Sequence, residues 1–444
     1  MIYNESKYNT SWKTEKLSGL GVFSRGISKH RPRNDPRLFT GGGYPLVQTG
    51  EIKEANLFIT SHTQEYGEFG LQQSRLWDAG TLCITIAANI AETAILSYPM
   101  CFPDSVVGFQ ANKAVSSELF MYYVFDYIRT AIQGAATGSA QDNINIDYLT
   151  SLEFKIPSKE YQDKIVGIVG SLDRMILKNE QINDNLQQQL RLLYDYWFTQ
   201  FDFPDENGKP YRSSGGAMVW NSTLKAEIPL GWTVGVLSDC IAKVSTGLNP
   251  RDNFKLGNGS IRYITVKNLT MSGVLDFSGC DTIDETAQTL IHRRSDISKG
   301  DILFASIAPL GRCYLIEQNP TDWEINESVF SIRPNIEMTT AEFLYSYFTS
   351  PAFIKGATSS STGSVFKGIR INTLLDTKVL IPPYRIASAF SAKVRGLFSM
   401  LDKNAAEIST LSGIRDWLLP MLMRTDALNY HLPAIDTVKG VIHG

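Results

Sequence analysis

The sequence predicts an α+β fold in which two globular mixed α/β domains are separated by two long antiparallel coiled-coil helices, with an internal pseudo-two-fold repeat. Three observations predict this fold class. At 444 residues the chain exceeds one ordinary domain. Its motifs recur at an interval of about 220 residues. Each repeat ends in a stretch of about forty residues with heptad-like apolar spacing.

Both halves of the chain carry the same motifs in the same order: a Trp, a Ser-x-Gly turn, an acid before Ser-Val, a Thr-Gly-Ser loop and an Ile-Pro turn. In the first half these are Trp12, Ser24-Arg25-Gly26, Asp104-Ser105-Val106, Thr137-Gly138-Ser139 and Ile156-Pro157. In the second half they are Trp232, Ser245-Thr246-Gly247, Glu327-Ser328-Val329, Thr362-Gly363-Ser364 and Ile381-Pro382. Such a long-period repeat predicts two copies of one structural unit.

The two globular domains are expected at residues 1–157 and 228–382. Each contains short β-like runs bounded by turn residues, namely LCITIA and SVVGF in the first and ILFASIA and SVFSI in the second. These runs are too short and too polar at their ends to be helices. A helix-like aromatic stretch follows in each, FMYYVFDYIR and FLYSYFTSPAF.

The two long helices are expected at residues 158–203 and 383–424. The first carries an apolar stripe made of Ile165, Ile168, Leu172, Met175, Ile182, Leu186 and Leu193, and the second a stripe made of Phe390, Val394, Leu397, Leu401, Ile408, Leu411, Leu418 and Leu422. Forty helical residues reach about 60 Å, so each helix overhangs a domain roughly 30 Å across. Packing of one helix on the other is therefore favoured over docking of each on its own domain.

The remaining segments are a connector and a tail. Residues 204–227 are rich in turn formers such as Asp-Glu-Asn-Gly-Lys and form the expected connector. Residues 425–444 are expected to form a loosely ordered C-terminal tail, or alternatively to contact the N-terminal segment.

Composition excludes several classes of protein. Five dispersed cysteines without C-x-x-C spacing and five histidines without ligand spacing predict reduced thiols and no metal site. No run of about 18 apolar residues and no signal-peptide pattern is found, which predicts a cytoplasmic protein without membrane contact. The net charge of −3 does not indicate nucleic acid, but Arg25 to Arg37 carries five basic residues against one acid.

Catalytic motifs are missing from the sequence. There is no G-x-x-x-x-G-K-[ST] motif for ATP, no nucleophile elbow and no metal triad. Leu248-Asn249-Pro250-Arg251 lacks the second proline and the aromatic residue of an amino-methyltransferase motif, and Glu153-Phe154-Lys155 is more simply a strand leading into a turn. The chain is therefore expected to be no enzyme and to hold no cofactor.

The ends of the two long helices carry a resemblance to a known family. The strings are LRLLYDYWFTQFDFP (190–204), DENGKPYRSSGGAM (205–218), IPLGW (228–232) and LSGIRDWLLPMLM (411–423). Over about residues 12 to 424 the chain resembles the DNA-specificity (S) subunits of type I restriction–modification enzymes. The resemblance makes the two globular domains target-recognition domains that each contact a few base pairs of a bipartite, asymmetric site in double-stranded DNA.

The resemblance also implies partners. Two modification (M) subunits would assemble on the chain, bind S-adenosylmethionine and methylate a flipped adenine in each half-site. Restriction (R) subunits would supply ATP- and Mg-dependent translocation and cleavage. The alternatives are the specificity subunit of a bipartite type II system, a single-chain restriction–modification enzyme, and a scaffold whose domains bind proteins.

Candidate DNA-binding residues are polar or basic side chains at matched turns of the repeat. In the first domain they are Arg25, Lys29, Arg31, Arg33, Gln48, Thr49, Asn89, Ser139 and Gln141. In the second domain they are Arg251, Lys267, Asn268, Arg312, Thr362, Ser364, Lys367 and Arg370.

Overall fold

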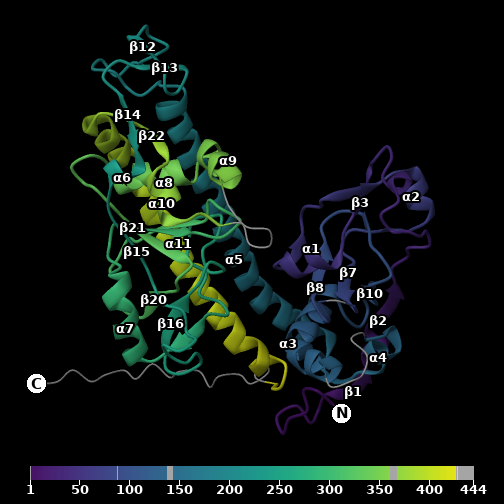
Figure 1. Cartoon of the computed structure of the whole chain (residues 1–444). Helices are drawn as coiled ribbons and strands as arrows, with labels where there is room; N and C mark the ends of the chain where they lie inside the picture. Colours follow the sequence, from purple (N-terminus) through teal and green to yellow (C-terminus); the bar gives the residue numbers. More distant parts are fainter. Residues whose placement is uncertain (1, 88, 138–143, 361–367, 427, 429–444) are drawn as a thin grey trace, which may run out of the picture. The chain divides into compact units, whose positions relative to one another are not determined.

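The computed structural model describes the chain except residues 1, 88, 138–143, 361–367, 427 and 429–444 (Figure 1). It divides into two compact units, residues 1–177 with 410–444 and residues 178–409. Each long helix is shared between the units, because the division falls within it.

The central sheet of the first unit has five strands in the order β2-β10-β7-β8-β4. Their bounds are β2 Gly21–Arg25, β10 Val106–Ala111, β7 Leu82–Thr85, β8 Thr93–Leu96 and β4 Phe58–Ile59. Every residue of β7 and β8 is buried, because helix α3 (Glu118–Thr137) packs its aromatic side chains on one face of the sheet and a second apolar cluster that contains Trp77 and Phe102 covers the other. Phe120, Tyr123 and Phe125 of α3 are fully buried there.

Smaller elements complete the first unit. A four-stranded sheet has the order β5-β3-β9-β6, made of β5 Gln64–Tyr66, β3 Tyr44–Leu46, β9 Met100–Cys101 and β6 Leu76–Trp77. β1 (Lys13–Lys16) pairs antiparallel with β11 (Glu153–Ile156). The short helices are η1 Leu17–Leu20, η2 Pro36–Leu38, α1 Thr49–Glu54, α2 Glu68–Gln72 and α4 Ile146–Ser151.

The second unit repeats this topology. Its central sheet has the order β15-β21-β18-β19, made of β15 Ile241–Thr246, β21 Val329–Pro334, β18 Ile302–Ala305 and β19 Cys313–Leu315. A second sheet has the order β17-β16-β20, made of β17 Asp281–Ile283, β16 Ile261–Ile264 and β20 Trp323–Ile325. β14 (Thr233–Val236) pairs with β22 (Lys378–Ile381) as β1 pairs with β11.

The helices of the second unit are α6 Leu237–Cys240, α7 Glu285–Ser295, α8 Ala341–Phe348, α9 Pro351–Ser360 and α10 Ile371–Leu375. The connector carries a hairpin, β12 (Met218–Asn221) with β13 (Ala226–Pro229). The matched motifs thus occupy matched strands: Asp104-Ser105 precedes β10 and Glu327-Ser328 precedes β21. The predicted internal repeat and the mixed α/β domains are confirmed.

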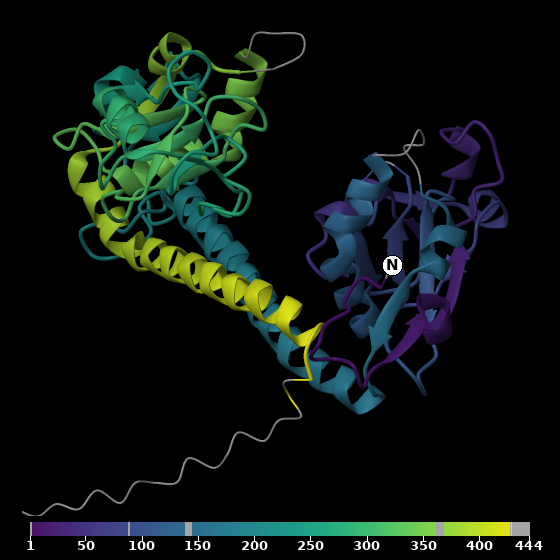
Figure 2. The ribbon, with the colours of Figure 1, turned by 90° about the horizontal axis from the view of Figure 1, so that it is seen from below.

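The two long helices are α5 (Lys159–Tyr194), continued by a π-helical turn Asp195–Thr199, and α11 (Tyr384–Leu422). They lie side by side and antiparallel (Figures 1 and 2). In the first unit Asp173 of α5 contacts Arg415 of α11. In the second unit Asn183 of α5 contacts Asn404 of α11. Positions rise along α5 as they fall along α11, so the predicted antiparallel helices are confirmed.

The end of α11 contacts the beginning of the chain inside the first unit. Asn4 donates from Nδ2 to the carbonyl oxygen of Met423 at 2.7 Å, and the amide of Asp426 donates to the carbonyl of Tyr8 at 3.2 Å. Tyr161 donates its hydroxyl to the carbonyl of Thr425 at 2.6 Å. Asp426 therefore contacts the N-terminal segment and Thr425 contacts α5, whereas most of the predicted tail lies outside the described residues.

None of the described helices has the length and the apolar character needed to cross a membrane. Within the same residues no three His, Cys, Asp or Glu side chains are grouped so that they could hold a metal ion.

Candidate nucleic-acid interface

One end of the central sheet in the first unit collects most of the predicted contact residues of that domain. The register pairs Val107 of β10 with Arg25 of β2, and Val106 with Thr85 of β7. The end of β2, the end of β7 and the beginning of β10 therefore lie together. The loops that leave this end carry the basic stretch after β2, Asn89 after β7, and Asp104 before β10.

Three arginines of this end converge on Asp104. Arg25 donates from Nε to the backbone carbonyl of Asp104 at 2.6 Å. Arg31 donates from NH2 to Oδ2 at 3.2 Å, and Arg33 donates from NH2 to Oδ1 at 2.5 Å. The side chains of Arg31 and Arg33 remain 53% and 52% exposed. The Asp104 carboxylate thus holds two guanidinium groups at the surface and its backbone carbonyl holds a third, and the local charge is positive.

A polar recess of about 270 Å³ lies beside this cluster. Arg33, Gln48 and Thr49 line it together with Ser28, Gln64 and Ser105. Gln48 begins helix α1, where its amide donates to Oε2 of Glu51 at 2.8 Å and its side chain donates to Oε1 of Gln64 at 2.6 Å. The structure therefore brings the predicted residues Arg33, Gln48 and Thr49 into one surface.

The other predicted residues of the first domain have simpler surroundings. The backbone amide of Lys29 donates to the carbonyl of Gln73 at 3.0 Å, which joins the basic loop to the segment before β6. Asn89 accepts from Nζ of Lys53 at 3.4 Å. Ser139 and Gln141 lie outside the described residues. The chain re-enters the described part at Ile144, whose amide donates to the carbonyl of Ile86 at this same end of the sheet.

The second domain presents the equivalent end of its sheet. Thr246 of β15 is paired with Phe330 and Ala305 of β18 with Val329, so the loops after β15 and β18 and before β21 emerge together. The amide of Ile369 donates to the carbonyl of Ser306 at 2.9 Å, as Ile144 does to Ile86 in the first domain.

The basic residues predicted for the second domain lie on these loops and on two neighbouring segments, those after β16 and before α10. Arg251 follows β15, Lys267 follows β16, Arg312 follows β18 and Arg370 precedes α10. Arg251, Lys267 and Arg370 are exposed. Burial lowers the pKa of the Arg312 guanidinium from its ordinary value, so an anion beside it would be favourable. Thr362, Ser364 and Lys367 lie outside the described residues.

Asn268 has a different environment from the other predicted residues. It is 6% exposed. Its Oδ1 accepts from the amide of Thr265 at 2.9 Å, and its Nδ2 donates to the carbonyl of Asp276 at 2.9 Å. These bonds shape the loop after β16 and use both ends of the side chain. Asn268 is therefore left out of the proposed interface.

Two residues near the first recess were missed by the sequence analysis. Arg75 is exposed, and its guanidinium carbon lies 4.0 Å from the ring centroid of Trp77. Gln64 begins β5 and lines the recess. Neither belongs to a matched motif of the repeat. A basic residue two positions before a Trp is the sequence signal that could have indicated Arg75. Packing of the guanidinium on the Trp77 ring then fixes the direction of the Arg75 side chain.

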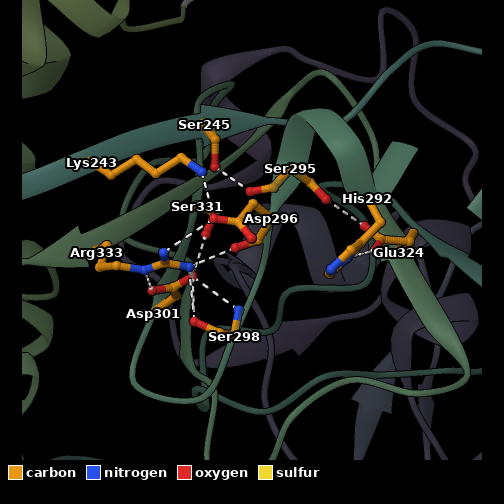
Figure 3. Close-up of polar contacts among 10 residues, drawn as sticks. All are labelled: Lys243, Ser245, His292, Ser295, Asp296, Ser298, Asp301, Glu324, Ser331 and Arg333. Atoms are coloured by element: carbon orange, nitrogen blue, oxygen red, sulfur yellow. Dashed lines mark hydrogen bonds and ion pairs between the residues drawn. The ribbon is translucent and has the colours of Figure 1, made fainter. Parts of the chain in front are cut away.

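Other cations of the second domain are held by acids at the opposite end of its sheet (Figure 3). Lys243 donates to Oδ2 of Asp296 at 2.6 Å, and Arg333 donates from Nε to Oδ1 of Asp301 at 2.8 Å. Asp301 is 1% exposed and sits just before β18. These ion pairs lie at the end of the sheet away from the loops, which leaves the loop-borne cations as the candidate contacts.

The comparisons with known proteins agree with this geometry. Residues 9–188 and 229–394 match the family described as type I restriction modification DNA specificity domain. The chain belongs to this family. Each matched segment contains one globular domain. The first also contains most of α5, and the second also contains the beginning of α11.

Two relatives in this family match nearly the whole chain. The MjaIX specificity subunit of a type I restriction enzyme from Methanocaldococcus jannaschii is 24% identical over 94% of this chain and 94% of its own length. The HindI specificity subunit from Haemophilus influenzae is 24% identical over 92% of this chain and 98% of its own length. The identification of the chain as a type I specificity subunit is thereby confirmed.

A solved structure shows the same fold. The S subunit of the type I restriction–modification system from M. genitalium superposes with a TM-score of 0.53 at 16% identity, covering 95% of this chain and 99% of that one. The family match also gives the two globular domains their name, target-recognition domains 1 and 2. The individual contact residues stay predictions.

Proposed function

We propose that this specificity subunit recognises a bipartite, asymmetric site in double-stranded DNA, with each target-recognition domain contacting one half. The observation that carries the proposal is the repeated sheet end. Both domains place basic and polar side chains on loops around the same end of the central sheet, with Arg33 and Gln48 in one domain and Arg251 and Arg312 in the other. Cations fix the protein on phosphates, and polar side chains distinguish bases.

The two domains present different side chains at equivalent places, which supports unlike half-sites. In domain 1 the loop before β10 holds an arginine cluster through Asp104. In domain 2 the equivalent residue is Glu327, which is exposed. A repeated fold with different loop residues would recognise two different short sequences through the same approach to DNA.

The partners proposed for this chain are two modification subunits and the restriction subunits. In the first unit α5 exposes Ile168 and Met175, seven positions apart, and α11 exposes Ile414 and Trp417, three positions apart, so each pair lies on one face of its helix. Exposed apolar side chains grouped on a helix face are typical of protein-binding surfaces. We assign this face to a modification subunit.

The chemistry is proposed to reside in those partners. S-adenosylmethionine would be bound by the modification subunit, and ATP with Mg²⁺ by the restriction subunit, since this sequence carries no motif for either. The chain itself would bind no cofactor and catalyse no step. The complex is proposed to act on DNA in the cytoplasm.

The proposal is tested by expressing the chain with its modification subunit and sequencing the methylated adenines of the host DNA. The expected result is a bipartite, asymmetric motif that disappears when this chain is omitted. A motif that persists without the chain, or a continuous motif, would contradict the proposal. Incubation of the purified chain alone with labelled S-adenosylmethionine and DNA should transfer no label, which separates it from a single-chain enzyme.

A further inference from the structure

Asp104 occupies an unfavourable place for an acid in a DNA-binding surface. It lies at the sheet end of target-recognition domain 1, among Arg25, Arg31 and Arg33, and its side chain is 27% exposed. A carboxylate there repels phosphates and offsets one of the arginine charges. The presence of Asp104, despite its repulsion of phosphates, is explained if its carboxylate holds an arginine side chain in a fixed direction.

Arg31 connects Asp104 to the backbone of its own loop. Its NH1 donates to the carbonyl oxygens of Ser28 at 2.5 Å and His30 at 2.8 Å, while NH2 donates to Oδ2 of Asp104. A guanidinium has five N–H donors, so Arg31 uses three of them inside the protein. Arg31 therefore links the Asp104 carboxylate to the backbone of the basic loop and fixes its position relative to that loop.

Arg33 is held differently. Within the part of the chain that the structure describes, its one hydrogen bond runs from NH2 to Oδ1 of Asp104. Its Nε and NH1 donors make no hydrogen bond there, and its side chain is 52% exposed beside the polar recess of Gln48 and Gln64. Arg33 is thus directed by Asp104 but keeps a free edge of the guanidinium for a ligand.

The remaining edge of Arg33 suits a base better than a phosphate. A phosphate would approach the Asp104 carboxylate as well as Arg33, and like charges repel. A guanine edge is neutral and offers two acceptors, O6 and N7, which match two N–H donors of an arginine in the major groove. Arginine held by an acid has few conformations to lose on binding, which favours discrimination between bases.

We propose that Arg33 recognises a guanine in the half-site of target-recognition domain 1, and that Asp104, fixed by Arg31, is the positioning residue for Arg33. This inference rests on the proposed function and deepens it. Domain 2 has an acid at the same place, Glu327, but among the described residues no arginine is hydrogen-bonded to it. The guanine contact is therefore specific to the first half-site.

The test uses the complex with the modification subunit and compares three variants with the wild type. Arg33→Ala removes the proposed recognising side chain, Asp104→Asn removes the charge that directs it, and Asp104→Glu retains that charge. Lys113→Ala is the matched control, because Lys113 lies beyond the opposite end of β10, is 71% exposed and pairs with Glu118. Methylated adenines are sequenced, and binding to cognate duplexes and duplexes with single-base substitutions is titrated at several salt concentrations.

Arg33→Ala is expected to relax one guanine position of one half-site and to lower discrimination there roughly ten- to hundredfold, with the other half-site unchanged. Asp104→Asn should relax the same position to a smaller extent, Asp104→Glu should restore part of the discrimination, and Lys113→Ala should keep the wild-type motif. Thermal melting should be similar for Arg33→Ala, Lys113→Ala and the wild type, because these two side chains are more than half exposed, and it shows directly whether the two Asp104 variants remain folded.

Three results would overturn the inference. The motif could be unchanged by Arg33→Ala, in which case Arg33 recognises no base. Affinity could fall equally for all duplexes with a salt slope reduced by about one, which is the signature of a phosphate contact. Asp104→Asn could match the wild type, which would remove the positioning role. Failure of the proposed function is distinct from these, since the wild-type chain would then direct no bipartite motif at all.

Discussion

Arg415 of α11 donates from NH1 to Oδ1 of Asp173 of α5 at 3.2 Å, inside the first unit. Tyr123 of α3 donates its hydroxyl to the other oxygen of Asp173 at 2.5 Å. The Asp173 side chain is 7% exposed. This carboxylate therefore joins both long helices to the helix that covers the sheet of target-recognition domain 1, beside a polar cavity of about 210 Å³.

Removal of Arg415 should destabilise the first unit. Arg415→Ala leaves the buried Asp173 carboxylate with a hydrogen bond from Tyr123 but without its cation, and breaking a buried ion pair in this way costs about 3–5 kcal/mol. The change is measured as a lower midpoint of urea unfolding. The control is Arg395→Ala, whose arginine is 71% exposed and 3.4 Å from Glu342, and which should change stability by less than about 1 kcal/mol. Equal effects of the two variants would contradict the structural role of Asp173.

Gly273 is a second position where a single change should weaken the fold. Its φ is +74°, and a Cβ there would lie 2.1 Å from both Nε2 of Gln187 and the hydroxyl of Tyr345. Those two groups form a buried hydrogen bond of 2.9 Å between α5 and α8. Gly273→Ala should therefore cost roughly 2–4 kcal/mol, because it adds backbone strain and separates this pair.

The control for Gly273 is Gly279, which has a similar φ of +61° and open space around its Cβ position. Gly279→Ala should cost only the strain of the left-handed conformation, about 1 kcal/mol. Unfolding in urea measures both. If the two alanine variants were equally stable, close packing at Gly273 would not be the cause.

The sequence predicted the long helices but only part of the surface that they bury. The predicted stripe includes Ile168 and Met175, which are exposed, whereas their neighbours Val169 and Ile176 are buried. The spacing of apolar residues identifies a helix and its period. It does not decide which of two adjacent apolar residues faces the partner helix, because both flanks of the seam are apolar.

The sequence predicted the basic loop of the candidate interface, but it did not predict that the arginines of this loop cluster around Asp104. Arg31 and Arg33 stand out in the sequence, but the acid that holds them lies 73 and 71 positions further along the chain. That contact exists only because β2 and β10 are neighbours in the sheet. Likewise, Asn268 is a plausible base contact by composition, and only the folded loop shows that its amide bonds to Thr265 and Asp276.

Acidic residues of domain 2 should give stability a pH dependence (Figure 3). Burial raises the pKa of the Glu324 carboxyl above its ordinary value of 4.5, although hydrogen bonds from Ser295 and His292 oppose the rise. The folded state then holds the proton more tightly than the unfolded chain. The contribution of Glu324 to stability is full below pH 4.5 and is lost as the pH rises through the folded pKa. Glu324→Gln should remove this decline.

The pKa of Asp296 is shifted in the opposite direction to that of Glu324, so its effect on stability should have the opposite pH dependence. A hydrogen bond from Lys243 lowers the pKa of Asp296 below its ordinary value of 3.8, so its contribution is present above pH 3.8 and lost as the pH falls through the folded pKa. Asp296→Asn should therefore change the dependence of the unfolding free energy on pH below about pH 3.8. Glu324→Gln should change that dependence above pH 4.5. Urea unfolding at a series of pH values distinguishes them, and parallel profiles for both variants would contradict the assignment.

Trp417 should matter for assembly and not for folding. Its side chain is 68% exposed on α11, so Trp417→Ala should change the free energy of unfolding by no more than about 0.5 kcal/mol. If the helix face binds a modification subunit, loss of this large aromatic group should weaken that association by about 2 kcal/mol or more, measured by titration of the purified subunits. Ile336→Ala is the control, since Ile336 is 76% exposed after β21 in domain 2. Equal affinities for Trp417→Ala and Ile336→Ala would place the modification subunit on another surface of the chain.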